Sequence, residues 1–105
     1  MEEPIVAVEA PLNHDLNLQA VTAIVRCGAP ESARWPDDPQ WVNLFFVYSE
    51  KKRFQSYSFE VVKRIVEDET DRGCPRFRVF TDSEGAVWVR SVSRKERRAT
   101  RQHWN

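Results

Sequence analysis

Hydrophobic residues gather in separate blocks along this 105-residue chain, with turn-forming residues between them. Residues 20–27 are rich in β-branched side chains and stop at Gly28, a pattern that predicts a strand. Residues 41–48 are apolar at nearly every position, which predicts a central strand covered on both faces. Between these blocks, residues 28–40 hold three prolines and two neighbouring aspartates. This composition predicts a loop that is long enough to carry function.

The pattern changes to the helical period after Ser58. Ser58 is a suitable N-cap residue, and Gly73 followed by Pro75 supplies a stop, so the segment predicts a helix. Charged side chains occupy the positions between the apolar ones and point the other way. The apolar face of this predicted helix consists of Phe59, Val62, Ile65 and Val66.

Two further blocks, residues 77–81 and 86–90, flank residues 82–85 and predict a β-hairpin in which Gly85 takes the positive-φ position. The predicted order is therefore β-β-α-β-β. A mostly antiparallel sheet with the helix packed on one face satisfies this order with short connections, so the expected fold class is α+β. Residues 5–8, which are bracketed by prolines, add the option of an extra N-terminal edge strand.

Three parts of the chain differ in pattern. Residues 1–19 are expected to form a loosely ordered arm or edge strand, residues 20–92 a single α+β domain, and residues 93–105 a basic helix or tail. Ser93 and Glu96 have the spacing of a capping box, which predicts a helix start. This helix is polar on all sides and cannot be held by core burial, so it either frays or becomes ordered on a partner.

The formal net charge is zero, but the charge is unevenly distributed. Residues 1–40 carry seven acids and two bases, whereas residues 72–105 carry three acids and nine bases. Arginine outnumbers lysine twelve to four, and guanidinium groups bind phosphate and carboxylate in a bidentate manner. The predicted partner-binding surface on the C-terminal segment consists of Arg94, Lys95, Arg97, Arg98, Arg101 and Trp104, with Arg76, Arg78 and Arg90 as an extension.

The basic segment has several interpretations, which differ in the partner that it would bind. The favoured one is a non-enzymatic binding protein, an adaptor, inhibitor or regulatory subunit that docks on a larger protein or protein complex. The alternative is a nucleic-acid-binding module whose arginines contact phosphates while Trp104 or His103 stacks on an unpaired base. Self-association, with the acidic front half of one copy against the basic end of another, is a third. A solubilising tail that folds against the acidic segment of its own chain needs no partner.

Trp35, in the proline-punctuated loop, is predicted as a second docking residue. An exposed tryptophan is a good interface anchor, but its ring can instead fold back and cap the sheet. The neighbouring Asp37 and Asp38 are interpreted as turn residues. A hard cation needs several converging oxygen ligands, and the sequence has no calcium-loop spacing. No metal site is predicted.

Catalytic and cofactor chemistry finds little support in the sequence. The chain has only two histidines, His14 and His103, and three glycines, and it lacks the motifs of nucleophilic catalysis and of phosphate-cradling loops. Cys27 and Cys74, without CxxC spacing, are interpreted as buried, reduced thiols, with a single disulfide bridge between two strand ends as the alternative. We expect no enzyme activity and no cofactor. We also expect no membrane partner and a cytoplasmic location, because no segment approaches the about 20 apolar residues of a membrane span.

Overall fold

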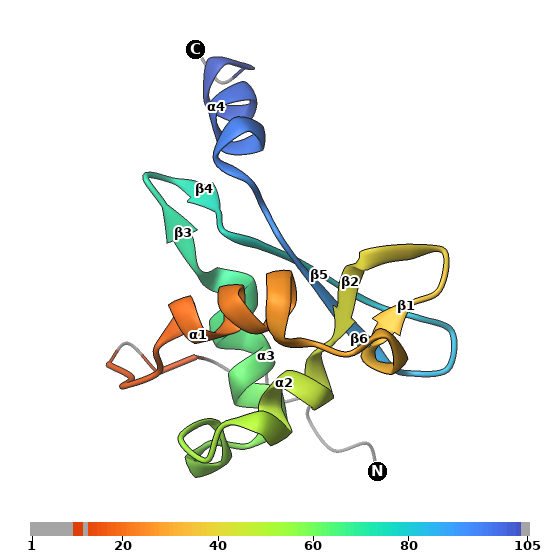
Figure 1. The fold of residues 1–105 in the computed structure, drawn as a ribbon. Coiled ribbons are helices and arrows are strands. Elements are labelled where there is room, and N and C mark those ends of the chain that lie inside the picture. The colour runs from red at the N-terminus through yellow and green to blue at the C-terminus, as the bar shows by residue number, and fades with distance from the viewer. Residues whose placement is uncertain (1–9, 12, 104–105) are drawn as a thin grey trace, which may run out of the picture.

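An antiparallel sheet with helices on one face forms the fold of residues 10–11 and 13–103, which are the residues that the structure, a computed structural model, describes. The strand order is β1-β2-β6-β5, and a separate pair, β3-β4, extends from the body (Figure 1). The predicted α+β class and its mostly antiparallel sheet are therefore confirmed. The strands are β1 (Arg34–Trp35), β2 (Asp38–Asn43), β3 (Thr70–Asp71), β4 (Cys74–Pro75), β5 (Phe77–Thr81) and β6 (Val87–Ser91).

The predicted hairpin near the C-terminus is confirmed as β5 and β6. The two strands pair in register from Phe77 opposite Ser91 to Thr81 opposite Val87. Gly85 takes the positive φ of 88° that the turn needs. Asp82 closes the turn, because its side chain accepts hydrogen bonds from the backbone N–H of Glu84 and of Ala86, both at 2.9 Å, and from the Trp88 indole at 3.0 Å.

The predicted central helix is also confirmed, as α3 (Phe59–Asp68). The Ser58 hydroxyl accepts a hydrogen bond from the backbone N–H of Val61 at 3.3 Å and caps the helix. α3 ends at Asp68, before the predicted stop at Gly73, and the chain enters β3 at Thr70. Gly73, with φ 82°, belongs to the turn between β3 and β4 instead. The buried face of α3 consists of Val62, Ile65 and Val66.

The strand predicted over residues 20–27 is wrong. The chain forms α1 (Leu18–Ala23), capped by the Asn17 side chain, and continues as the π-helix η1 (Ile24–Gly28). The buried positions repeat at helical spacing, and this burial outweighs the β-propensity of the individual side chains. α1 also runs across the predicted boundary between residues 19 and 20. The side chains of α1 and η1 that enter the core are those of Leu18, Val21, Ile24 and Val25.

The long strand predicted over residues 41–48 is correct only up to Asn43. The Asn43 side chain accepts hydrogen bonds from the backbone N–H of Phe45 at 2.9 Å and of Phe46 at 3.3 Å. It therefore caps a helix, α2 (Leu44–Glu50), and ends β2. The apolar run thus spans two elements, and Phe45 stays 59% exposed.

The loop predicted over residues 28–40 is largely ordered into regular structure. It contains the short 3₁₀ helix η2 (Glu31–Ala33) and most of the hairpin that β1 and β2 form. A second 3₁₀ helix, η3 (Phe54–Ser56), joins α2 to α3 and buries Phe54. The optional edge strand over residues 5–8 lies outside the described residues.

The core fills the space between the sheet and the helices α1, α2 and α3, which gather on one side of it (Figure 1). Val42 of β2 and Val89 of β6 lie opposite each other and are fully buried. Alternation along β6 turns Trp88 and Arg90 to the other face, here called the outer face. In the part of the chain that the structure describes, no helix is long and apolar enough to cross a membrane.

Candidate partner-binding surface

The C-terminal helix α4 (Arg94–His103) begins where the sequence predicts. The Ser93 hydroxyl accepts a hydrogen bond from the Glu96 backbone N–H at 3.1 Å, which completes one arm of the capping box. The Glu96 carboxylate also accepts two hydrogen bonds from Arg90 of β6, at 2.8 and 3.2 Å. This bidentate pair ties the first turn of α4 to the sheet.

Arg90 lowers the pKa of the Glu96 carboxyl below its usual value, chiefly through this hydrogen bond, while burial acts in the opposite direction. Arg78 lies directly across from Arg90 in the β5–β6 register and contributes to the same shift. Like charges placed opposite each other on a sheet repel. The Glu96 carboxylate therefore compensates a repulsive pair of cations as well as capping α4.

Polar contacts hold α4 against the β3–β4 hairpin. The Arg97 side chain is only 15% exposed and forms an ion pair with Asp71 at 3.7 Å. The Cys74 thiol lies 3.7 Å from the Arg97 carbonyl oxygen, to which it donates. A helix without an apolar stripe is thus attached to the domain through its polar groups. Figure 1 shows it at the end of the molecule beside β3 and β4.

A groove of about 500 Å³ lies between α1 and the start of α4. We call it the basic groove, because five of its lining residues are cationic and none of those in the described part of the chain is acidic. These cations come from η1, from the link between β4 and β5, and from α4. The basic groove is lined by Thr22, Arg26, Arg76, Ser91, Val92, Ser93, Arg94, Lys95 and Arg97.

The cations of the basic groove differ in their partners. Arg76 and Arg97 form long ion pairs with Glu69 and Asp71, at 3.8 and 3.7 Å. Arg26 donates to the Ser91 hydroxyl at 3.4 Å. Among the described residues, neither Arg26 nor Arg94 nor Lys95 has a carboxylate within 4.0 Å of its charged nitrogens.

A neighbouring cavity, which shares Arg94 and Arg97 with the basic groove, extends the positive surface. Its volume is about 360 Å³, and Asp71 is the single acid among its described lining residues. Arg72 lines it from the β3–β4 turn, where the Arg72 backbone has a positive φ of 53°. The arginines that line it are Arg72, Arg94, Arg97 and Arg98.

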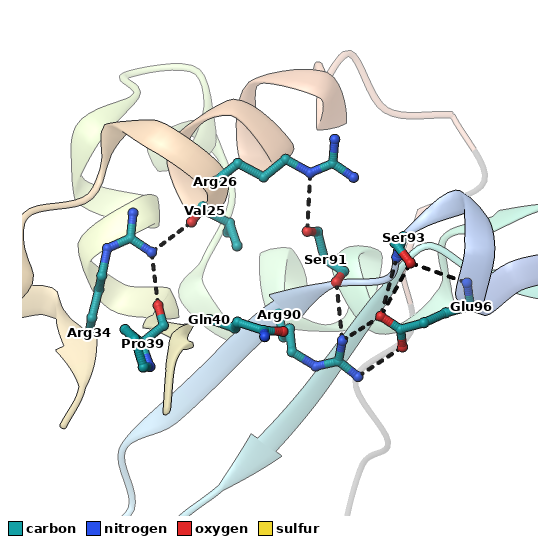
Figure 2. A pocket seen from close by; sticks show the side chains of 9 residues that line it. All are labelled: Val25, Arg26, Arg34, Pro39, Gln40, Arg90, Ser91, Ser93 and Glu96. Atoms are coloured by element: carbon teal, nitrogen blue, oxygen red, sulfur yellow. Dashed lines mark hydrogen bonds and ion pairs between the residues drawn. The ribbon is translucent and has the colours of Figure 1, made fainter. Parts of the chain in front are cut away.

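A third cavity, of about 440 Å³, lies where β2 separates from β6 (Figure 2). Its arginines are mostly engaged within the fold. Arg34 donates to the carbonyl oxygens of Val25 and Pro39, both at 2.9 Å, and Arg90 binds Glu96. Figure 2 shows Arg26 reaching across to Ser91, which this cavity shares with the basic groove.

The predicted surface residues fall into separate groups. The basic groove is lined by Arg76 and by three of the predicted α4 residues, Arg94, Lys95 and Arg97. Arg98 lines the neighbouring cavity. Arg90 is committed to Glu96 and stacks on Trp41, with 5.5 Å between its guanidinium carbon and the ring centre. Arg78 is exposed on β5. The Arg101 side chain and Trp104 lie outside the described residues.

Sequence reasoning missed two members of the positive surface, Arg26 and Arg72. Arg26 belongs to a segment predicted as a strand, so nothing placed its side chain near α4. Arg72 belongs to a turn that the predicted helix was expected to include. The signal that could have found Arg26 is the helical spacing of Leu18, Val21 and Val25, which sets Arg26 outside the buried face.

Trp35 folds back on the outer face of the sheet, as the second interpretation of its loop predicts. Its ring packs edge-on against Trp88, with 4.9 Å between the ring centres, and against Phe80 at 5.6 Å. Trp41 packs against Phe80 at 4.7 Å. These four side chains, here called the outer aromatic cluster, are half-buried and separate from the core.

The other candidate residues have structural roles or stand apart. The Asp38 side chain accepts from the Gln40 backbone N–H at 3.2 Å within the β1–β2 hairpin, in line with a turn role. The described residues contain no cluster of ligands that could hold a metal ion. Both cysteines are free thiols; Cys74 is buried, but Cys27 is exposed, so its predicted burial is wrong because it faces away from the core on η1. His14 is half-buried, and its Nδ1 has no hydrogen-bond partner among the residues that the structure describes.

Comparison with models of protein families, with curated proteins and with solved structures finds no match to this chain. The fold and the geometry of the basic groove are therefore the basis for a functional proposal.

Proposed function

We propose that this protein is a non-enzymatic binding protein, a small adaptor, inhibitor or regulatory subunit that docks on a larger protein through α4 and the basic groove. One observation carries the proposal. Arg26 of η1 converges on one groove with Arg94 and Lys95 of α4, and the described residues supply no carboxylate partner for these three cations. Cations that face one hollow without a carboxylate partner in the described part of the chain favour an acidic partner surface.

The charge of the whole chain favours a protein over a nucleic acid as the partner. Nucleic-acid-binding domains are typically basic overall, because each phosphate contact adds to affinity. This chain has a net charge of zero, and Glu69, Asp71 and Glu96 lie beside its cations. Such a mixed surface fits a defined patch of carboxylates on a protein better than a uniform chain of phosphates.

The test compares two charge reversals at opposite ends of the molecule. The first is Arg94→Glu with Lys95→Glu; the matched control is Lys51→Glu with Lys52→Glu, in the loop after α2, which lies away from α4 (Figure 1). Both change the net charge equally. Binding of a fluorescent ten-residue glutamate peptide is followed by anisotropy at low salt.

We expect the peptide to bind the wild type and the control, and to bind the α4 variant at least tenfold more weakly. Two interfacial cations contribute at least this much when they face carboxylates. Equal losses in both variants would show a response to net charge alone and contradict a defined surface. The absence of binding to the wild type would also contradict the proposal.

A second candidate function is nucleic-acid binding, which the outer aromatic cluster favours. Aromatic rings on the open face of an antiparallel sheet can stack on unpaired bases, and Arg78 lies on the same face. In this case a single-stranded oligonucleotide binds more tightly than the glutamate peptide, and Trp35→Ala weakens it. Two further points stay predictions: that Trp35 contributes to protein docking, and that the protein self-associates.

A further inference from the structure

We propose that the basic groove is a phosphate-binding site that takes one phosphorylated serine or threonine of the protein partner. The inference rests on the proposed function, because it names the group on the partner that α4 recognises. Its starting point is charge. Five cations line the groove, and no acid does so among its described lining residues.

The two ion pairs of the groove leave its donors open. The Arg76–Glu69 and Arg97–Asp71 pairs measure 3.8 and 3.7 Å, longer than a hydrogen bond. Each carboxylate therefore balances charge without occupying a guanidinium N–H. The Ser91 hydroxyl accepts from Arg26, so its own hydrogen is available to an incoming oxygen. Arg26 and Ser91 thus offer neighbouring donors to one anion.

The first turn of α4 adds an electrostatic conflict that an anion resolves. The N-terminus of a helix carries partial positive charge and disfavours cations. Arg94 and Lys95 nevertheless occupy the first two positions of α4, and both line the groove, whereas Glu96, the acid of this turn, binds Arg90 and does not line it. A bound dianion compensates these cations and the helix terminus together.

Size and neighbouring charge favour a single phosphate monoester. A volume of about 500 Å³ suits one or two residues of a ligand. A phosphoserine carries roughly −1.5 to −2 charge and three acceptor oxygens, which suits the cations of Arg26, Arg94 and Lys95. Glu69 and Asp71 lie beside the groove cations Arg76 and Arg97 and repel any further phosphates of an extended nucleic-acid backbone.

The test uses the full chain and the peptide acetyl-Gly-Gly-pSer-Gly-Gly, with unphosphorylated and Glu-substituted peptides as comparisons. Backbone NMR follows shifts and affinity, and inorganic phosphate serves as a minimal probe. We expect the phosphopeptide to bind at least tenfold more tightly than either comparison, with shifts at Arg26, Ser91 and Lys95. We expect Arg26→Ala to weaken binding about tenfold or more.

The control Arg53→Ala removes a cation of the distant loop after α2 and is expected to leave affinity unchanged. Lys95→Ala is a second variant in case Arg26→Ala disturbs η1. Equal binding of the phosphorylated and Glu-substituted peptides, or no effect of either variant, overturns the phosphate site. The proposed function is tested separately, by binding of the glutamate decapeptide, and does not fall with the phosphate site. If an oligonucleotide binds more tightly than the phosphopeptide and depends on Arg26, the phosphoprotein partner is wrong.

Discussion

The pair between Glu96 and Arg90 joins the first turn of α4 to the sheet. Glu96→Gln removes the charge of the carboxylate and keeps its shape. The variant loses the charge-assisted bidentate bond to Arg90 and leaves Arg78 and Arg90 facing each other without a compensating anion. We therefore expect a less stable protein whose α4 is less helical.

The size of the loss follows from the exposure of the two side chains. Hydrogen bonds to charged groups contribute about 1.5–3 kcal/mol when buried, whereas exposed ion pairs contribute about 0.2–1 kcal/mol. Arg90 is 16% exposed, but Glu96 is 41% exposed, so solvent screens the pair considerably. We expect Glu96→Gln to lower the free energy of unfolding by about 1 kcal/mol at pH 7.

The pH dependence has a definite sign. The folded pKa of Glu96 lies below the value of about 4.3 for an unfolded chain. The stabilisation is therefore complete above pH ~4.3 and is lost as the pH falls through the folded pKa. Because glutamine does not titrate, the gap between wild type and Glu96→Gln narrows on acidification.

Urea unfolding between pH 7 and pH 3, followed by tryptophan fluorescence and circular dichroism, measures this gap. Glu84→Gln is the matched control, since Glu84 is exposed in the β5–β6 turn and has no ion pair among the described residues. A gap that widens as the pH falls, or an equal loss in the control, would refute the reasoning.

Further predictions concern the core, a turn and the thiols. Leu44→Ala is expected to cost about 2–5 kcal/mol in the free energy of unfolding, because Leu44 is fully buried, whereas Phe45→Ala costs less than about 1 kcal/mol; chemical denaturation measures both. Gly85→Ala is expected to cost about 1 kcal/mol through its positive φ alone, since its Cβ meets no atom within 4 Å; thermal melts check this. Cys27 is expected to react with maleimide in the native protein and Cys74 only after denaturation, so mass spectrometry counts one label and then two.

The elements that sequence reasoning placed correctly have local boundary signals. Ser58 caps α3, Gly85 supplies the positive φ of the β5–β6 turn, and Ser93 caps α4. Each signal acts within a few residues of chain, so it can be recognised without knowledge of the rest of the fold.

The elements that were mispredicted depend on distant contacts. The β-branched residues of α1 and η1 become helical because Val21 and Val25 pack into a core that other segments supply. Arg34 donates to the carbonyl oxygens of Val25 and Ala29, which supports the end of η1. Asn43 was a local signal that was overlooked inside an apolar run, although asparagine is a common helix cap.

The structure brings several of the residues predicted to bind a partner together at one groove and adds cations that the sequence pattern did not reveal. Arg94, Lys95 and Arg97 gather at the basic groove as neighbours on one short segment must. The position of Arg26 depends on η1, and most of this segment was predicted to be a strand. The use of Arg90 within the fold depends on the β5–β6 register and on Glu96, and a linear pattern shows neither of these.

The most direct test of the docking surface is to map where the glutamate decapeptide binds. Titration into the ¹⁵N-labelled protein, followed by backbone and indole resonances, separates the basic groove from the outer aromatic cluster. The proposal predicts the largest shifts at Arg26, Ser91, Arg94 and Lys95, with little change at the Trp88 indole. Shifts concentrated at the indoles of Trp35 and Trp88, with the basic groove unchanged, would contradict it.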